Sequence, residues 1–200
     1  MPGEPITRRG RASRERIVER AAELFAARGV AGTSLDEVLA AAGAGKGQLY
    51  HYFRSRDELA AAAVGYRCGQ VIAELSQALG DVSSLAGLEE TLAGFVAAFE
   101  QMGLPGCPIG TLATEVAGRN EDARLQAAAG FDAWERLLAD ALERMRANGE
   151  LRAAAEPAVL ATGLLASIEG GMVLSQVRKD IATLRIAVAA GLGQVRACAG

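Results

Sequence analysis

The sequence predicts an all-α protein with a small amino-terminal helical unit followed by a larger helical body. Alanine-rich and leucine-rich segments place apolar residues at the 3.6-residue spacing of helices along the whole chain. No segment shows the alternation of valine, isoleucine and threonine that is typical of strands. Half of the 200 residues are hydrophobic but only 4% are aromatic. Alanine and the aliphatic side chains must therefore build the core.

Capping and breaking residues predict where the helices begin and end. Ser13 is a candidate N-cap for a first helix, which Gly29 stops. Ser34 and Glu37 have the spacing of a capping box and begin a second helix, which ends before Gly43. Further helices are expected at about residues 46–52, 55–79, 85–102, 109–118, 121–148, 157–177 and 180–197.

The chain divides at about residue 55. Residues 1–55 form the small unit, and residues 56–200 form the body, which the helix at 55–79 joins to it. Within the body, glycine and proline cluster at 103–108, the strongest loop signal in the chain.

Composition excludes several classes of protein. A single histidine and three widely spaced cysteines do not suit a standard zinc site or a disulfide framework, so we expect no metal and no cofactor. No secretory signal is recognisable, and the longest charge-free apolar run, 157–168, is too short to span a bilayer. We therefore expect a reduced, soluble, cytoplasmic protein without a membrane partner.

Charge is distributed unevenly along the chain. The net charge is −3, yet residues 1–60 carry ten Lys and Arg against eight Asp and Glu, whereas the remainder carries eleven against sixteen. A mildly basic amino-terminal part on an acidic body favours a local contact with a polyanion over binding along the whole surface. A solvated basic tail is the simpler alternative.

The segment 33–53 has the spacing of a helix-turn-helix, with Gly43 at the sharp turn. Six apolar side chains face one small core: Leu35, Val38, Leu39, Ala42, Leu49 and Phe53. The other side chains of the second helix are polar or amphipathic and are expected to face outward: Lys46, Gln48, Tyr50, His51 and Tyr52. A short outward helix of this kind fits a DNA major groove, where amides read base edges and amines and phenols reach phosphates.

The run Lys-Gly-Gln-Leu-Tyr-His-Tyr-Phe-Arg-Ser-Arg-Asp-Glu-Leu at 46–59 resembles the DNA-binding region of the tetracycline-repressor (TetR) family. The matching positions are Lys46, Gly47, Leu49, Tyr50, Phe53, Arg56 and Leu59. Tyr52 stands where many members have histidine. The resemblance is close over about residues 13–60, and the segments 106–116 and 168–180 resemble parts of the family's body more loosely.

The resemblance implies a homodimeric transcriptional regulator, most often a repressor that a small molecule releases from operator DNA, and not an enzyme. The implied DNA-binding residues are Thr33, Ser34, Lys46, Gly47, Gln48, Tyr50, His51, Tyr52 and Arg56. We assign Lys46, Tyr50, Arg56 and the Thr33 hydroxyl to phosphates. Gln48 is assigned to a base edge, with assistance from His51. The domains would then be 1–55 for DNA and 56–200 for effector binding and dimerisation.

The body contains two aromatic stripes, and such stripes are more often core than ligand contacts. In the family, however, the body encloses a small-molecule cavity, and the implied lining residues are Phe95, Phe99, Met102, Cys107, Ile109, Leu112, Val116, Phe131, Trp134, Ile168 and Met172. Cys107, between glycine and proline in a loop, is also open to interpretation as a redox or electrophile sensor.

The last two predicted helices are the expected dimer interface, because in the family they pair with those of a second subunit. Gly170-Gly171 in an apolar helix is costly and suits close approach across that interface, although a simple kink would also explain it. The expected interface residues are Gly163, Gly170, Gly171, Leu174, Leu184 and Val188.

Two other functions are the alternatives to a regulator. A helical small-molecule-binding protein without operator-specific DNA binding is the main alternative, and an enzyme is disfavoured because no nucleophile or acid–base pair can be nominated. The glycines around Lys46 do not form a phosphate-binding loop, because Gly47 follows the lysine where serine or threonine is required.

Overall fold

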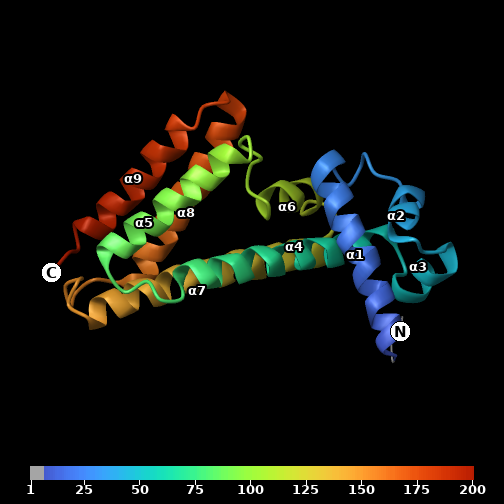
Figure 1. The fold of residues 1–200 in the computed structure, drawn as a ribbon, viewed down its shortest axis with the longest axis horizontal. Coiled ribbons are helices and arrows are strands. Elements are labelled where there is room, and N and C mark those ends of the chain that lie inside the picture. The colour runs from blue at the N-terminus through green and yellow to red at the C-terminus, as the bar shows by residue number, and fades with distance from the viewer. Residues whose placement is uncertain (1–6) are drawn as a thin grey trace. The chain divides into compact units, whose positions relative to one another are not determined.

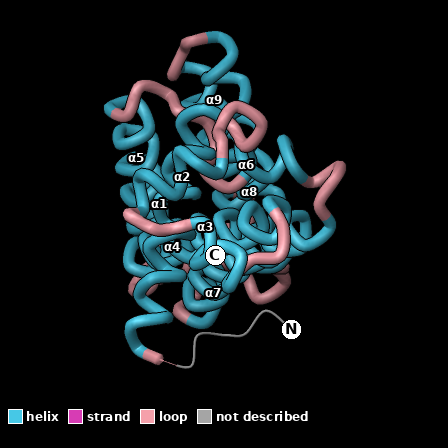
Figure 2. The backbone as a smooth tube through the Cα atoms, turned by 90° about the vertical axis from the view of Figure 1, so that its right-hand side faces the viewer, coloured by secondary structure: helices cyan, strands magenta, loops and turns pink. Residues whose placement is uncertain are grey.

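The computed structural model describes residues 7–200, and this part of the chain is helical without strands (Figures 1 and 2). The helices are α1 (Arg8–Arg28), α2 (Leu35–Ala42), α3 (Lys46–Tyr52), α4 (Arg56–Leu79), α5 (Leu85–Gln101), α6 (Gly110–Val116), α7 (Glu121–Ala147), α8 (Pro157–Arg178) and α9 (Ala182–Arg196). The predicted fold class is therefore confirmed. The one β-type contact described is an isolated bridge between Leu151 and Ala199.

The chain forms two compact units, each of which contains two segments of sequence. The first unit comprises residues up to Val71 together with Pro108–Gly130, and the second comprises Ile72–Cys107 and Phe131–Gly200. Helices α4 and α7 each contribute to both units. These units follow packing, so the functional division at residue 55 stays a prediction.

In the first unit, α1, α2 and α3 pack around one small apolar core. The predicted inward residues Val38, Leu39, Ala42, Leu49 and Phe53 are all buried, whereas Leu35 is half-buried. Buried side chains of α1 and α4 complete this core: Ile17, Val18, Ala21, Phe25, Leu59 and Ala63. The turn between α2 and α3 is sharp because Gly43 adopts φ +58°, a left-handed conformation that glycine accepts without strain.

Local capping explains most helix ends in this unit. Ser34 Oγ accepts a hydrogen bond from Glu37 N, and Glu37 accepts one from Ser34 N, which confirms the predicted capping box. The predicted cap at Ser13 is wrong. Helix α1 begins earlier, where Thr7 Oγ1 accepts a hydrogen bond from Gly10 N, and Ser13 is buried within the helix.

In the second unit, α8 and α9 form a tightly packed helical hairpin, and α5 packs against α9 (Figure 1). Lys179 ends α8 in a left-handed conformation, and Ser175 Oγ then accepts a hydrogen bond from Leu184 N at 2.8 Å. Helix α8 is the one described helix that is long and apolar enough to cross a membrane by length and composition, and 44% of that stretch is buried inside the structure.

The three cysteines lie in different environments. Cys68 on α4 and Cys107 before α6 are buried, whereas Cys198, which follows α9, is half-buried. No group of three or more His, Cys, Asp and Glu side chains in residues 7–200 is arranged to hold a metal ion.

Candidate functional site

Helix α3 presents one polar face to solvent and buries the other. Leu49 on α3 and Phe53, just after the helix, are buried in the core. Lys46, Gln48, Tyr50 and His51 lie at the surface. Tyr50 is 60% exposed, which is unusual for a large aromatic side chain. The predicted outward face of the second helix is confirmed for these four residues.

Tyr52 does not belong to this face, so its predicted outward orientation is wrong. It lies three residues after Leu49, on the same side of the helix, and is buried. Its ring contacts His51 edge to face, with ring centroids 5.1 Å apart, and Phe53 at 6.5 Å. Tyr52 therefore orients its neighbours from within the core.

Two of the outward side chains already have polar partners. Gln48 Oε1 accepts a hydrogen bond from Gly45 N at 3.0 Å, and its Nε2 donates to Ser13 Oγ at 3.4 Å. Lys46 Nζ lies 3.0 Å from Asp36 Oδ1. The hydrogen bond and negative charge of Asp36 raise the pKa of Lys46, so its ammonium is firmly protonated. Contacts of these groups with DNA would either replace the local ones or use the remaining N–H donors.

Thr33 and Ser34 have structural roles at the start of α2. Thr33 is 1% exposed, and its hydroxyl donates to Gly29 O at 2.9 Å and Leu24 O at 3.3 Å. The assignment of this hydroxyl to a phosphate is therefore wrong, because it points into the protein. Ser34 is exposed, but its hydroxyl is engaged by Glu37 in the cap.

Arg56, also assigned to phosphate, is tied to the loop between α1 and α2. One guanidinium nitrogen donates to the carbonyls of both Val30 and Thr33, from the first residue of α4. Arg56 thus holds backbone in place, and its assignment to DNA is not supported by this geometry. The exposed glycine Gly47 has open space at its Cβ position, so its backbone is accessible on the surface of α3.

The same loop binds a residue that the sequence did not single out. Glu115, on α6, accepts hydrogen bonds from Val30 N at 2.8 Å and Ala31 N at 2.7 Å. The contact joins residues about 85 positions apart. No local sequence signal indicates it, because helical periodicity does not reveal which distant segment an exposed carboxylate meets.

The residues expected to line an effector cavity are distributed over both units. Ile109, Leu112 and Val116 are buried in the first unit. In the second unit Phe99, Cys107, Trp134, Ile168 and Met172 are buried, Phe95 and Phe131 are half-buried, and Met102 is exposed.

The aromatic stripes of the second unit pack against each other. Phe95 stacks on Phe99 with ring centroids 6.5 Å apart, and meets Trp134 edge to face at 6.2 Å. This cluster is a packed aromatic contact between α5 and α7 and builds the core of the unit.

A partly buried carboxyl group, that of Glu169, lies next to Cys107. Burial raises the pKa of Glu169 on α8, and a hydrogen bond with the Cys107 side chain opposes this rise. Glu169 Oε1 is enclosed without a hydrogen-bond partner in the described structure. A carboxyl in this environment favours its neutral form more than an exposed one does.

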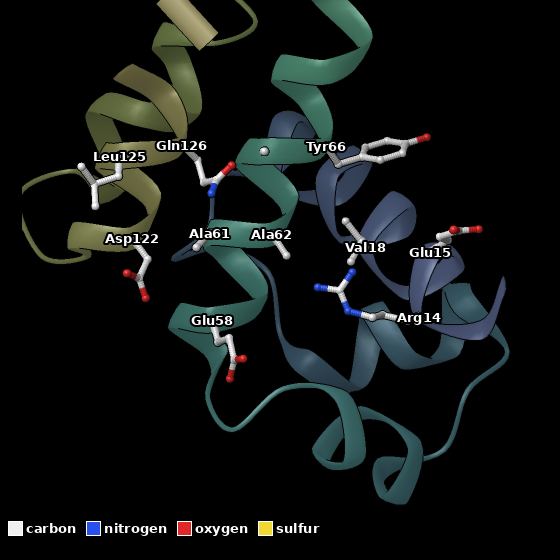
Figure 3. Close-up of a pocket in the computed structure, with 11 residues that line it drawn as sticks. Arg14, Glu15, Val18, Glu58, Ala61, Ala62, Tyr66, Asp122, Leu125 and Gln126 are labelled. Atoms are coloured by element: carbon white, nitrogen blue, oxygen red, sulfur yellow. The ribbon is translucent and has the colours of Figure 1, made fainter. Parts of the chain in front are cut away.

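Two surface grooves are described, one in each unit. The first, of about 540 Å³, lies between α1, α4 and α7, and Figure 3 shows α4 with Ala61 and Ala62 between the helix that carries Asp122 and the helix that carries Arg14. The second, of about 390 Å³, lies between α5 and α9. Neither groove contains a residue that we expected to line an effector cavity.

Comparison with known proteins identifies the family. The model "Bacterial regulatory proteins, tetR family" matches residues 17–63, which contain α2 and α3, and the model "Transcriptional regulator LmrA/YxaF-like, C-terminal domain" matches residues 84–190. The chain belongs to the TetR family. It is a DNA-binding transcriptional regulator of the helix-turn-helix class.

Individual TetR-family proteins resemble the chain over most of its length. The HTH-type transcriptional regulator YxaF of Bacillus subtilis is 34% identical over 84% of this chain and 87% of its own. The repressor NemR of Escherichia coli is 28% identical over 88% of this chain and 90% of its own. The crystal structure of reduced NemR has a TM-score of 0.78 and covers 94% of this chain and 97% of its own, at 25% identity.

TetR-family regulators function as dimers, and the structure places the six expected interface residues on two different faces. Leu184 is fully buried, and Val188 and Gly171 are buried with it where α9 packs within its own chain. Packing inside one chain occupies Gly171 and Leu184, which contradicts their expected role at the interface. Val188 lines the groove between α5 and α9, so its expected role stays a prediction. Gly163 is half-buried, while Gly170 and Leu174 are exposed.

Proposed function

We propose that this TetR-family chain is a homodimeric repressor that binds operator DNA through α3 and releases it when a small molecule binds the helical body. The observation that carries the proposal is the outward face of α3. Lys46, Gln48, Tyr50 and His51 project from a short helix whose other face is anchored by Leu49. Cationic, amide and phenolic groups on such a helix suit the major groove and its phosphates.

The motif residues are proposed to have two kinds of role in DNA binding, direct contact and support of the backbone. Lys46 and Tyr50 remain the proposed phosphate contacts, and Gln48 the proposed base contact. Arg56 and Thr33 act on DNA indirectly, because they hold the backbone before α2. Two such α3 helices in a dimer would read half-sites about 34–36 Å apart, one turn of DNA.

The dimer is proposed to form through the exposed stripe of α8 together with α9. Along α8, small and apolar residues recur at intervals of three and four, which places them on one face: Val159, Gly163, Ala166, Gly170, Val173, Leu174 and Val177. Val177 is 75% exposed, and Ile186 on α9 is 70% exposed. Exposed large apolar side chains on two adjacent helices are characteristic of a protein–protein interface.

We propose that a small molecule releases the protein from DNA because effector binding and operator binding favour different conformations. An effector lowers operator affinity if it binds more tightly to the conformation whose recognition helices are wrongly spaced for DNA. Repression, as opposed to activation, is supported by relatives whose names describe them as repressors, among them NemR. Of the candidate cavity residues, Phe95 contacts Trp134 and stacks on Phe99 in the second unit.

One experiment separates this proposal from a small-molecule-binding protein that does not read DNA. The purified protein is mixed with a pool of DNA duplexes of random sequence, and the duplexes that it binds are sequenced. A symmetric motif with half-sites one helical turn apart supports the proposal, whereas recovery of sequences without a common motif contradicts it. Compounds that raise the melting temperature are then titrated against the selected duplex.

Trp134 provides the second readout. It is the single tryptophan of the chain, so its fluorescence reports on the second unit without interference. An effector should change this emission and release the selected duplex over the same concentration range. Release without any change in emission would place the effector site away from Trp134.

A further inference from the structure

The loop between α1 and α2 is held by side chains from two other helices. It begins at Gly29, the C-cap of α1, and ends at Ser34, the N-cap of α2. Backbone groups that do not take part in helical hydrogen bonds need other partners. Here Val30 N donates to one carboxylate oxygen of Glu115, and Ala31 N donates to the other. A single side chain thus binds two consecutive amides.

Gly29 allows this carboxylate to approach. The residue adopts φ +76°, and a Cβ atom built on it would lie 3.0 Å from Glu115 Oε2 and 3.2 Å from Oε1. Both the backbone angle and the space next to it therefore favour glycine. The conformation of the loop at Gly29 is therefore suited to the position of the Glu115 carboxylate.

The carbonyl groups of the same loop are held from α4. Arg56 donates to the carbonyls of Val30 and Thr33, and the Thr33 hydroxyl donates to Gly29 O. Two amides of the loop are thus bound from α6, and two of its carbonyls are bound from α4. Because Ser34 follows directly and caps α2, the position of the loop sets where α2 begins, and the turn at Gly43 then sets α3.

We infer that Glu115 is a positioning residue for operator binding: through its two hydrogen bonds it holds the α1–α2 loop in the conformation that presents α2 and α3 to DNA. The inference rests on the proposed function. Glu115 lies on α6, which begins shortly after the chain leaves the second unit at Cys107. Within the first unit, the helix-turn-helix is therefore attached to a helix that closely follows Cys107 in the sequence.

The exposure of this contact determines what its removal should change. Glu115 is solvent-exposed, so water can replace its hydrogen bonds to Val30 N and Ala31 N when the side chain is removed. The global stability of the protein should then change little. The loop, however, would sample more conformations, and the cost of ordering it again would appear when DNA binds.

The test compares Glu115→Ala and Glu115→Gln with a matched control, Glu121→Gln. Glu121 is also exposed and in the first unit, but its carboxylate pairs with Arg124 on its own helix. The probe is a duplex of about 30 base pairs selected by the wild-type protein from a random pool, long enough for two half-sites. Binding affinity is measured over a salt series, together with the melting temperature and amide hydrogen exchange.

We expect Glu115→Ala to bind the duplex about tenfold more weakly, because the loop must be ordered again when DNA binds. Glu115→Gln, which keeps one acceptor oxygen, should lie between it and the wild type, and Glu121→Gln should match the wild type. The slope of affinity against salt should not change, because every proposed phosphate contact is retained. Exchange at the amides of Val30 and Ala31 should accelerate in Glu115→Ala.

Wild-type or tighter affinity in Glu115→Ala overturns the inference. So does a drop in affinity that accompanies a fall in melting temperature of more than about 5 °C, since this would reflect general destabilisation. An equal drop in Glu121→Gln overturns it as well. If the wild-type protein selects no sequence at all, the proposed function itself fails, and that result is obtained before any variant is made.

Discussion

Gly171 of α8 lies directly against Leu184 of α9. A Cβ atom built on Gly171 would stand 2.8 Å from Leu184 Cδ1 and 2.9 Å from the Ala187 Cβ. The neighbouring Gly170 faces the other way and has nothing within 4 Å of its Cβ position. The two adjacent glycines therefore serve different purposes, the first in packing the hairpin and the second in shaping its outer surface.

Substitution of these glycines should change stability in opposite directions. Gly171→Ala should lower the free energy of unfolding by about 1–3 kcal/mol, because the added methyl group overpacks the α8–α9 contact. Gly170→Ala should raise it by up to about 1 kcal/mol through better helix propensity. Urea denaturation measures both changes. Equal effects of the two substitutions would contradict the assignment of the glycines to different faces.

The proposed dimer can be tested with a charge placed on the outer stripe of α8. Val177→Glu and Gly170→Arg should each give a folded monomer, because an unpaired charge would have to be buried at the interface. The control is Leu125→Glu, which alters an exposed apolar side chain in the first unit. Light scattering gives the mass, and circular dichroism gives the helix content. Dimers in both α8 variants would place the interface elsewhere.

DNA contacts of two kinds should respond differently to alanine. Lys46→Ala should weaken binding to all sequences alike and reduce the salt slope by about 0.9 for each phosphate that is no longer neutralised, twice that in a dimer. Gln48→Ala should leave the slope unchanged and relax preference at one base pair per half-site by about 1–3 kcal/mol. Fluorescence anisotropy with selected and mismatched duplexes separates the two outcomes.

Asp36 supplies a control for the lysine. It pairs with Lys46 Nζ, so Asp36→Ala frees the ammonium for DNA and removes a negative charge beside it. Binding should become tighter in this variant. Weaker binding in Asp36→Ala would indicate that the ion pair orients Lys46 and does not compete with DNA for it.

Glu169 should lower the free energy of unfolding as pH rises, whereas a carboxylate that is paired in the folded protein raises it. Because burial raises its pKa in the folded protein, its favourable contribution is fully present below the unfolded pKa and is lost as pH rises through the folded value. Glu169→Gln, which stays neutral, should therefore be more stable than the wild type at pH 7 and similar to it near pH 4. Urea midpoints at the two pH values measure the difference. A variant less stable than the wild type at pH 7 would show that the charged carboxylate is stabilised there.

Sequence reasoning succeeded where the signal is local. The bounds of α3, the capping box of Ser34 and the turn at Gly43 follow from residues within a few positions of one another. It failed at Tyr52, whose polar hydroxyl suggested an outward orientation although its spacing from Leu49 places it on the inward side of α3. It also failed where a distant segment decides: Leu184 is apolar in an apolar helix, and helical periodicity does not show which partner it contacts.

The candidate site shows the same limit. The identity of Arg56 matches the family motif, yet its guanidinium is directed to the carbonyls of Val30 and Thr33. The role of Glu115 follows from contacts across 84 and 85 residues, and no pattern within α6 distinguishes it from other exposed acids. Motif matching identifies the family's positions in this chain without stating which of their side chains are free to touch DNA.

The unequal burial of the three thiols should allow one of them to be labelled selectively with a dye. Cys68 and Cys107 are enclosed, whereas Cys198 is partly accessible just beyond α9. A maleimide dye applied to the native protein should therefore attach at Cys198 with little competition, near the carboxyl end and far in sequence from α3. Each subunit would then carry one fluorophore, and energy transfer between donor-labelled and acceptor-labelled subunits would report how quickly chains exchange.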